Sequence, residues 1–83
     1  MIIYGIDLTT LPQAKRAAVH DEFEKWDIMR ELIIDKSEVM VALVVFWDEP
    51  SPFPCGIPIP ANCPVTVIPS DGISDYRKYI LSQ

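Results

Sequence analysis

The sequence predicts a small single domain of the α/β or α+β class, spanning residues 1–83. At this length the chain is too short for two hydrophobic cores. Segments rich in apolar and β-branched residues alternate with segments of helical periodicity, in the order strand, helix, strand, proline-rich loop, short strand and C-terminal helix. We therefore expect a small sheet covered by the long helix.

The first strand and the helix after it are predicted from local signals. Residues 2–8 begin with apolar, β-branched and aromatic side chains, which are typical of a strand. Thr10 and Gln13 fit a capping box, and Pro12 would lie in the first helical turn, where a missing N–H does no harm. A helix is expected from there to about Ile34. Its apolar side, the expected core face, comprises Val19, Phe23, Trp26 and Ile33, with Leu11, Ala18 and Met29 beside them.

The opposite side of that helix collects polar residues in a narrow stripe. Its acidic members are Glu24, Asp27 and Glu31, with Asp35 nearby. Such a stripe can meet a basic patch on another protein or imitate spaced phosphates. The alternative is an ordinary solvated helix face. Under the first reading these three acids are candidate partner-binding residues.

A strand is expected over residues 39–47, where both alternate positions are apolar, as in a strand that is covered on both faces or covered on one face and used for contact on the other. We expect this strand to be central in the sheet. Residues 65–68 predict a short strand, and residues 73–81 a C-terminal helix that turns Tyr76, Tyr79 and Ile80 to the core. The first strand, helix and second strand fit either a right-handed crossover with parallel strands or a helix packed across an antiparallel sheet.

Parallel strands would bring Asp7 close to Asp48 and Glu49 at one edge of the sheet, and three carboxylates can hold Mg²⁺. The alternative is that these are solvated charges at strand ends. The chain's one histidine, His20, falls on the polar helix side, and with Cys55 and Cys63 it leaves a zinc site one ligand short. No catalytic residue and no cofactor are predicted.

Seven of the eight prolines lie between residues 50 and 69. This segment either wraps Phe53, Ile57 and Ile59 over the core or serves as a partner-binding loop that offers Phe53 and Ile57, and it lacks the P-x-x-P spacing of an SH3-type ligand. Cys55 and Cys63 are expected to be reduced thiols, because nothing in the sequence points to a secretory context.

Composition limits the classes of partner. The net charge is −5, and no Lys or Arg occurs between Lys36 and Arg77, which argues against direct nucleic-acid binding. Hydrophobic residues make up 49% of this small chain, which suggests a surface for a partner or for self-association. The longest apolar run is far short of the roughly 20 residues that span a bilayer. A cytoplasmic protein without membrane contact is expected.

These observations predict a small, acidic, non-enzymatic protein-binding module of the inhibitor or adaptor kind. Its partner would be a protein with a basic or apolar surface. Small acidic inhibitors of host nucleic-acid enzymes, made by phages and other mobile elements, share this size and charge, although the analogy is one of class and no motif supports it. A Mg²⁺-dependent enzyme using the strand-end carboxylates and a structural subunit of a homo-oligomer are the alternatives.

Overall fold

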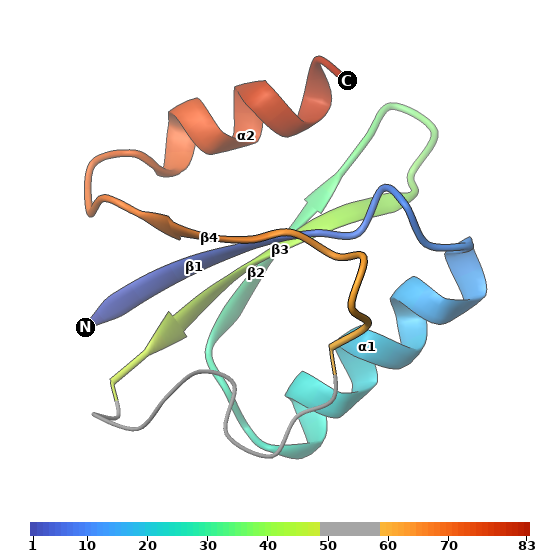
Figure 1. The fold of residues 1–83 in the computed structure, drawn as a ribbon, viewed down its shortest axis with the longest axis horizontal. Helices are drawn as coiled ribbons and strands as arrows, with labels where there is room; N and C mark the ends of the chain where they lie inside the picture. The colour runs from blue at the N-terminus through green and yellow to red at the C-terminus, as the bar shows by residue number, and fades with distance from the viewer. Residues whose placement is uncertain (49–58) are drawn as a thin grey trace.

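A computed structural model describes residues 1–48 and 59–83 of the chain. Four strands and two helices lie within these residues (Figure 1). In chain order they are β1 (Ile2–Asp7), α1 (Gln13–Lys25), β2 (Arg30–Ile34), β3 (Met40–Trp47), β4 (Val65–Ile68) and α2 (Ile73–Leu81). The predicted strands at residues 2–8, 39–47 and 65–68 and the predicted C-terminal helix are therefore present.

The strands form one antiparallel sheet in the order β2-β3-β1-β4. β1 and β3 lie side by side with Ile2 opposite Trp47 and Asp7 opposite Ala42. The fold is thus α+β, and the parallel crossover is excluded. After α1 the chain forms the β2–β3 hairpin. The turn of this hairpin reverses the chain, so that β3 pairs with β1 in the antiparallel direction.

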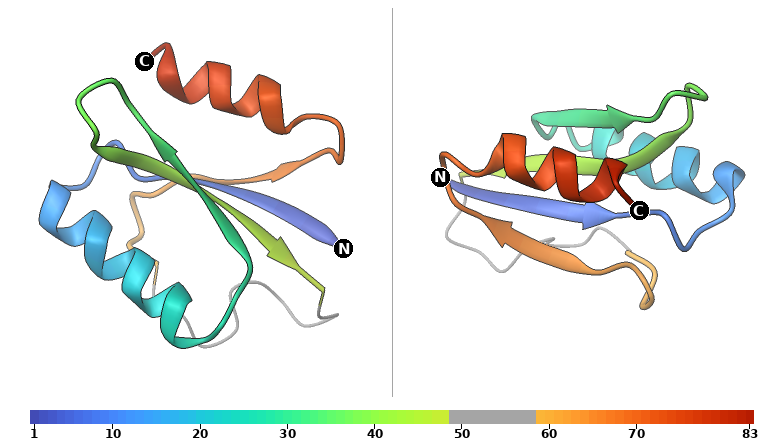
Figure 2. Two further views of the ribbon diagram at one scale, coloured as in Figure 1. Left: turned by 180° about the vertical axis from the view of Figure 1, so that it is seen from behind. Right: turned by 90° about the horizontal axis from the view of Figure 1, so that it is seen from above.

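The two helices cover opposite faces of the sheet (Figures 1 and 2). Alternate residues of β3 face each helix, so Leu43 and Val45 pack with Phe23 of α1, whereas Val44 packs with Ile80 of α2. Residues 41–45 of β3 are all buried. The prediction of a central strand covered on both faces is confirmed, and the long helix covers one face while α2 covers the other.

The prediction that the long helix runs to about Ile34 is wrong, because α1 ends at Lys25. Asp27 has φ 56°, the Asp27 N–H donates to Glu24 O, and the Ile28 N–H donates to Phe23 O. This pair of bonds around a left-handed residue is a Schellman motif, with Asp27 where glycine is most common. The buried side chains of Ile28 and Phe23 belong to one core cluster, which supplies the apolar contact that accompanies this motif.

The early end of α1 changes what the expected core face contains. Trp26 and Met29 are exposed, at 52% and 68%, and Ala18 is also exposed. Ile33 is buried, but as a residue of β2 that packs on the α2 side of the sheet. The expected core positions Leu11, Val19 and Phe23 are confirmed.

Two details of the helix termini also differ from expectation. Pro12 is the N-cap of α1 rather than a first-turn residue, and no side chain caps this helix. The Thr10 hydroxyl donates instead to Asn62 O at 2.9 Å, joining the start of α1 to the segment before β4. At the other end of the chain, Ile80 is buried, Tyr76 is partly buried and Tyr79 is exposed.

Candidate functional site

The three predicted acids do not form one stripe. Glu24 is in α1, Asp27 occupies the left-handed position after this helix, and Glu31 is in β2. The carboxylate of Glu31 forms an ion pair with Arg77 of α2, so Glu24 and Glu31 are engaged on opposite sides of the sheet. Phe53 and Ile57, the predicted apolar contacts, lie outside the described residues.

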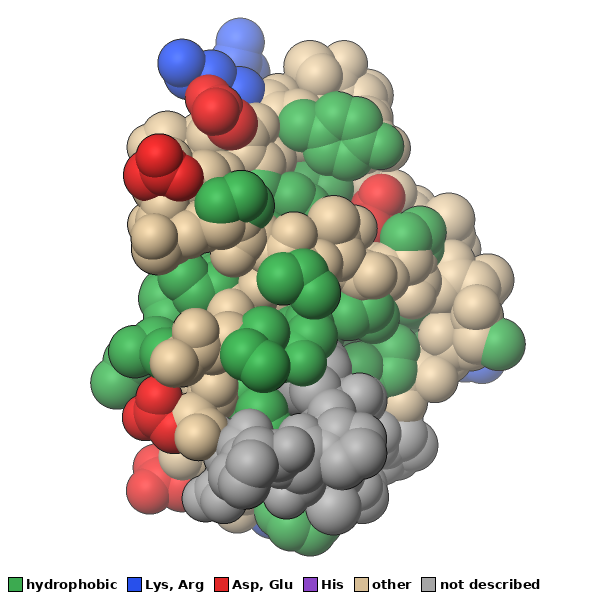
Figure 3. All heavy atoms as spheres, turned by 60° about the vertical axis from the view of Figure 1, so that its left-hand side comes forward, with side chains coloured by type: hydrophobic (Ala, Val, Ile, Leu, Met, Phe, Trp, Pro, Cys, Tyr) green, Lys and Arg blue, Asp and Glu red, His purple; other side chains and the backbone are tan. Residues whose placement is uncertain are grey.

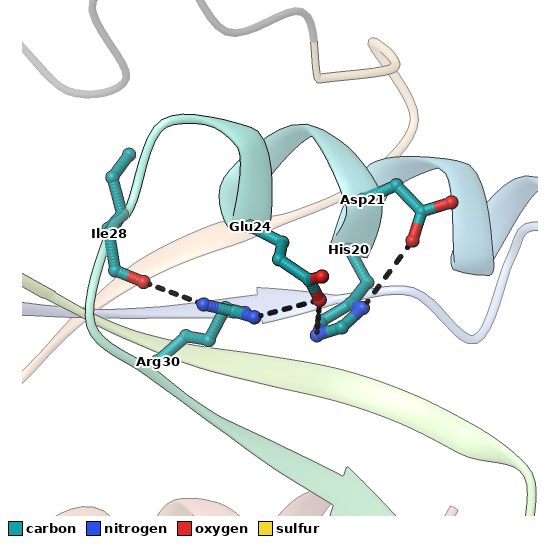
Figure 4. A network of polar contacts seen from close by, with 5 residues as sticks. All are labelled: His20, Asp21, Glu24, Ile28 and Arg30. Atoms are coloured by element: carbon teal, nitrogen blue, oxygen red, sulfur yellow. Dashed lines mark hydrogen bonds and ion pairs between the residues drawn. The ribbon is translucent and has the colours of Figure 1, made fainter.

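Glu24 belongs to a polar network that fastens β2 to α1 (Figure 4). Arg30 Nη2 donates to Glu24 Oε2 at 3.2 Å, and Arg30 Nη1 donates to Ile28 O at 3.0 Å. The His20 ring stands beside this carboxylate, with Nε2 4.0 Å from Glu24 Oε2, and its Nδ1 is 3.8 Å from Asp21 Oδ1. These contacts occupy Glu24 within the fold and hold the start of β2 against the helix.

Asp27 instead borders an exposed apolar corner, which we call the Trp26–Met29 corner and define by Trp26, Asp27, Met29 and Asp48. All four residues are exposed. They surround a shallow hollow of about 330 Å³ between the end of α1 and the end of β3, to which Ile28, Phe46 and Trp47 also contribute. The corner therefore combines two large apolar side chains with two carboxylates.

Sequence reasoning missed this corner because Trp26 and Met29 fit the apolar periodicity of a longer helix. The signal that could have revealed it is the apolar pair Phe23 and Ile28 five positions apart, the spacing of a Schellman contact. Without glycine between them this signal is weak. Asp27 is the predicted site residue that the structure brings into the corner.

The proposed magnesium site is not assembled. In the antiparallel pair of β1 and β3, Asp7 lies opposite Ala42 while Trp47, next to Asp48, lies opposite Ile2, so Asp7 and Asp48 stand at opposite ends of the sheet. The Asp7 carboxylate accepts hydrogen bonds from the backbone and hydroxyl of Thr9, at 2.9 and 2.5 Å. Glu49 lies outside the described residues, within which no cluster of three or more acidic, His or Cys side chains is placed to hold a metal.

Cys63 is a free, buried thiol, and Cys55 lies outside the described residues. Burial raises the pKa of the Cys63 thiol, the nearby Asp7 charge raises it further, and a hydrogen bond with Thr10 opposes both effects. Because the thiolate is the reactive form, this environment is that of a structural cysteine and not of a nucleophile.

The chain matches no protein-family model, and comparisons with curated proteins and with solved structures find no significant similarity. No helix within residues 1–48 and 59–83 is both long and apolar enough to cross a membrane.

Proposed function

We propose that the protein is a non-enzymatic protein-binding module that contacts its partner through the Trp26–Met29 corner. The observation that carries this proposal is the exposure of Trp26 and Met29 beside a hollow rimmed by Asp27 and Asp48. Aromatic residues and methionine are enriched in protein interfaces, and tryptophan is prominent among the residues that dominate binding energy.

The chemistry of the corner specifies the kind of partner. An apolar side chain of the partner would enter the hollow, and Lys or Arg residues around it would face Asp27 and Asp48. The net charge of −5 adds a long-range attraction for a basic surface. A protein surface that is apolar with a basic rim fits both features, and an inhibitor or adaptor would act by docking on such a surface. Action in the cytoplasm, where thiols are kept reduced, is part of this proposal.

Affinity capture from the native cell, followed by binding measurements with the captured partner, tests this proposal. Trp26→Ala should raise the dissociation constant about thirty-fold, the effect of losing a contact worth about 2 kcal/mol. Met29→Ala should act in the same direction with a smaller effect. The matched control is Tyr79→Ala, which removes an exposed aromatic ring from α2, on the other face of the sheet.

Thermal melts of all three variants should stay close to that of the wild type, because the substituted side chains are exposed. If Trp26→Ala and Met29→Ala bind the partner as tightly as the wild type, the corner is not the contact surface and the proposal fails.

A further inference from the structure

The outer edge of β4 carries backbone groups that nothing in the described part of the chain pairs. β4 is the terminal strand of the sheet on the side away from β2. The Asp7 N–H donates to Pro64 O at 3.0 Å, and Thr66 lies opposite Gly5. In an antiparallel ladder, hydrogen-bonded pairs alternate with pairs that are not hydrogen-bonded. Since Asp7 and Pro64 are a hydrogen-bonded pair, Gly5 and Thr66 are the next one. Val65 and Val67 occupy the positions between, so their N–H and C=O groups point outward, away from β1.

This edge lacks the charges and irregularities that protect many open strands, and its protection is limited to its short length and to the prolines on either side of it. No residue of β4 is charged, and Val65 and Val67 are 43% and 64% exposed. β2, the opposite edge, carries Arg30 and Glu31, each ion-paired to a helix, and a register shift after Ile33. Charges and irregularities of this kind discourage pairing between sheet edges.

Among the described residues, the elements next to β4 leave its outer edge open. Seen from above, β4 runs along the outer margin of the sheet while α2 crosses further in (Figure 2). Hydrophobic side chains spread across the middle of the face that includes β4 and α2 (Figure 3). Between β4 and α2 lies a groove of about 480 Å³ whose apolar lining includes Val67, Pro69 and Tyr79.

We propose that β4 pairs antiparallel with β4 of a second copy of this chain, about a two-fold axis at Thr66. Residues 65–67 read Val-Thr-Val in either direction. In this register Val65 of each copy is opposite Val67 of the other, and all four outward N–H groups and all four outward C=O groups become paired. Cross-strand pairs of β-branched residues add to the stability of a sheet.

Other registers satisfy fewer of the same groups. Placing Val65 opposite Val65 would set Val67 opposite Cys63, which lies before the strand and is buried. Pro64 and Pro69, which cannot donate a backbone hydrogen bond, flank the strand and confine pairing to the four residues between them. The register with the two-fold axis at Thr66 is therefore the one that pairs the most outward backbone groups of β4.

The dimer would contain one continuous sheet of two copies joined at β4, with β2 at each outer edge. Residues 26–29 of the Trp26–Met29 corner directly precede β2 in each copy, so two corners would remain free at the far ends of the assembly. Because both copies carry a charge of −5, added salt should strengthen the association by screening their repulsion.

Sedimentation equilibrium over a range of protein concentrations, at low and moderate salt, tests the proposal. The wild type should change from monomer to dimer as its concentration rises. Val67→Pro removes an outward N–H that the ladder with β1 does not use, so the fold should survive while the dimer dissociation constant rises about ten-fold or more. Val67→Ile, the matched control, keeps this N–H and the β-branched shape and should dimerise like the wild type.

Mixing two charged variants tests the register. Val65→Glu in one copy and Val67→Lys in the other would place opposite charges across the interface, so the mixture should form more heterodimer than either variant forms homodimer. A mixture of Val65→Glu with Val65→Lys should show a weaker preference, since those positions are diagonal to each other and not directly opposite. A wild type that stays monomeric up to its solubility limit, or a Val67→Pro variant that dimerises like the wild type, would overturn the proposal.

Discussion

The phenol ring of Tyr76 lies so close over Gly5 that a Cβ atom built on Gly5 would stand 2.4 Å from Tyr76 Cζ. This contact brings α2 onto β1, and glycine is needed there for close approach and not for an unusual backbone angle. We predict that Gly5→Ala lowers the free energy of unfolding by about 1–3 kcal/mol, because the added methyl group must displace the ring. Urea denaturation measures this loss.

A double-mutant cycle provides the control. In a Tyr76→Ala background the ring is gone, so Gly5→Ala should cost much less than in the wild type. Equal losses in the two backgrounds would show that the methyl group and the ring do not compete for the same space.

The hydroxyl group of Tyr76 supports a second prediction. It is buried and has no hydrogen-bond partner among the described residues. Burial, followed by the negative charge of Asp7, raises the pKa of Tyr76 above its usual value of 10.0. Above pH 10 the unfolded chain therefore ionises this tyrosine while the folded chain resists ionisation, so stability should fall as the pH rises further.

The Tyr76→Phe variant should show a smaller loss of stability in this alkaline range. At neutral pH it should be as stable as the wild type or up to about 1 kcal/mol more stable, because it removes an unpaired buried hydroxyl. Denaturant melts at a series of pH values compare the two proteins, and parallel curves for wild type and Tyr76→Phe would refute this assignment.

The third prediction concerns Arg16, whose guanidinium group donates hydrogen bonds to three backbone carbonyl groups. Nε donates to Leu11 O at 2.9 Å, Nη1 to Met40 O at 3.1 Å and Nη2 to Thr9 O at 3.2 Å. This fork ties the loop before α1 to the beginning of β3. Arg16→Lys retains the charge but not the fork, and it should cost about 1–3 kcal/mol of unfolding free energy. Lys15→Ala, at the neighbouring exposed position, should change stability by less than about 0.5 kcal/mol.

The fourth prediction concerns Leu43, which is fully buried between the sheet and α1. Leu43→Ala should reduce the free energy of unfolding by about 2–5 kcal/mol, since it removes methyl groups and leaves a cavity. Leu32 lies directly opposite Leu43 on β2 but is exposed, so Leu32→Ala should cost clearly less. Similar losses in denaturant melts would mean that burial does not distinguish the two sites.

Sequence patterns predicted the elements whose structure is set by local signals. β3 is apolar at every position because helices cover both faces of the sheet, and the turn before α2 is marked by Asp71 and Gly72. The segment from Trp26 to Ile34 was predicted wrongly, because Trp26, Met29 and Ile33 also match helical spacing. Its strand structure depends on pairing with β3, a contact that no local pattern displays.

The candidate site was hard to predict for the same reason. A helix through residue 34 would align Glu24, Asp27 and Glu31, whereas the observed turn separates them and exposes Trp26. The sequence does not show whether β1 and β3 run parallel or antiparallel. Asp7 would lie near Asp48 only if they were parallel. Which backbone N–H and C=O groups of β4 point outward likewise depends on its register with β1. The sequence of a short β-branched strand does not determine that register.

The last prediction separates the acids that could steer a partner from those engaged within the fold. Asp27→Asn together with Asp48→Asn removes both carboxylates of the Trp26–Met29 corner, and asparagine tolerates the left-handed conformation at residue 27. Complementary charges chiefly raise association rates, so this variant should bind the captured partner about three- to ten-fold more slowly, with a weaker salt dependence.

Glu31→Gln with Asp71→Asn is the matched control, because it makes the same change in net charge away from the corner. It breaks the half-exposed ion pair with Arg77, which should cost no more than about 1 kcal/mol of stability, and it should leave the association rate much closer to that of the wild type. Stopped-flow association measured across a salt series distinguishes the two variants. Equal slowing of both would mean that only the total charge attracts the partner, and no slowing of either would mean that these acids are solvated surface.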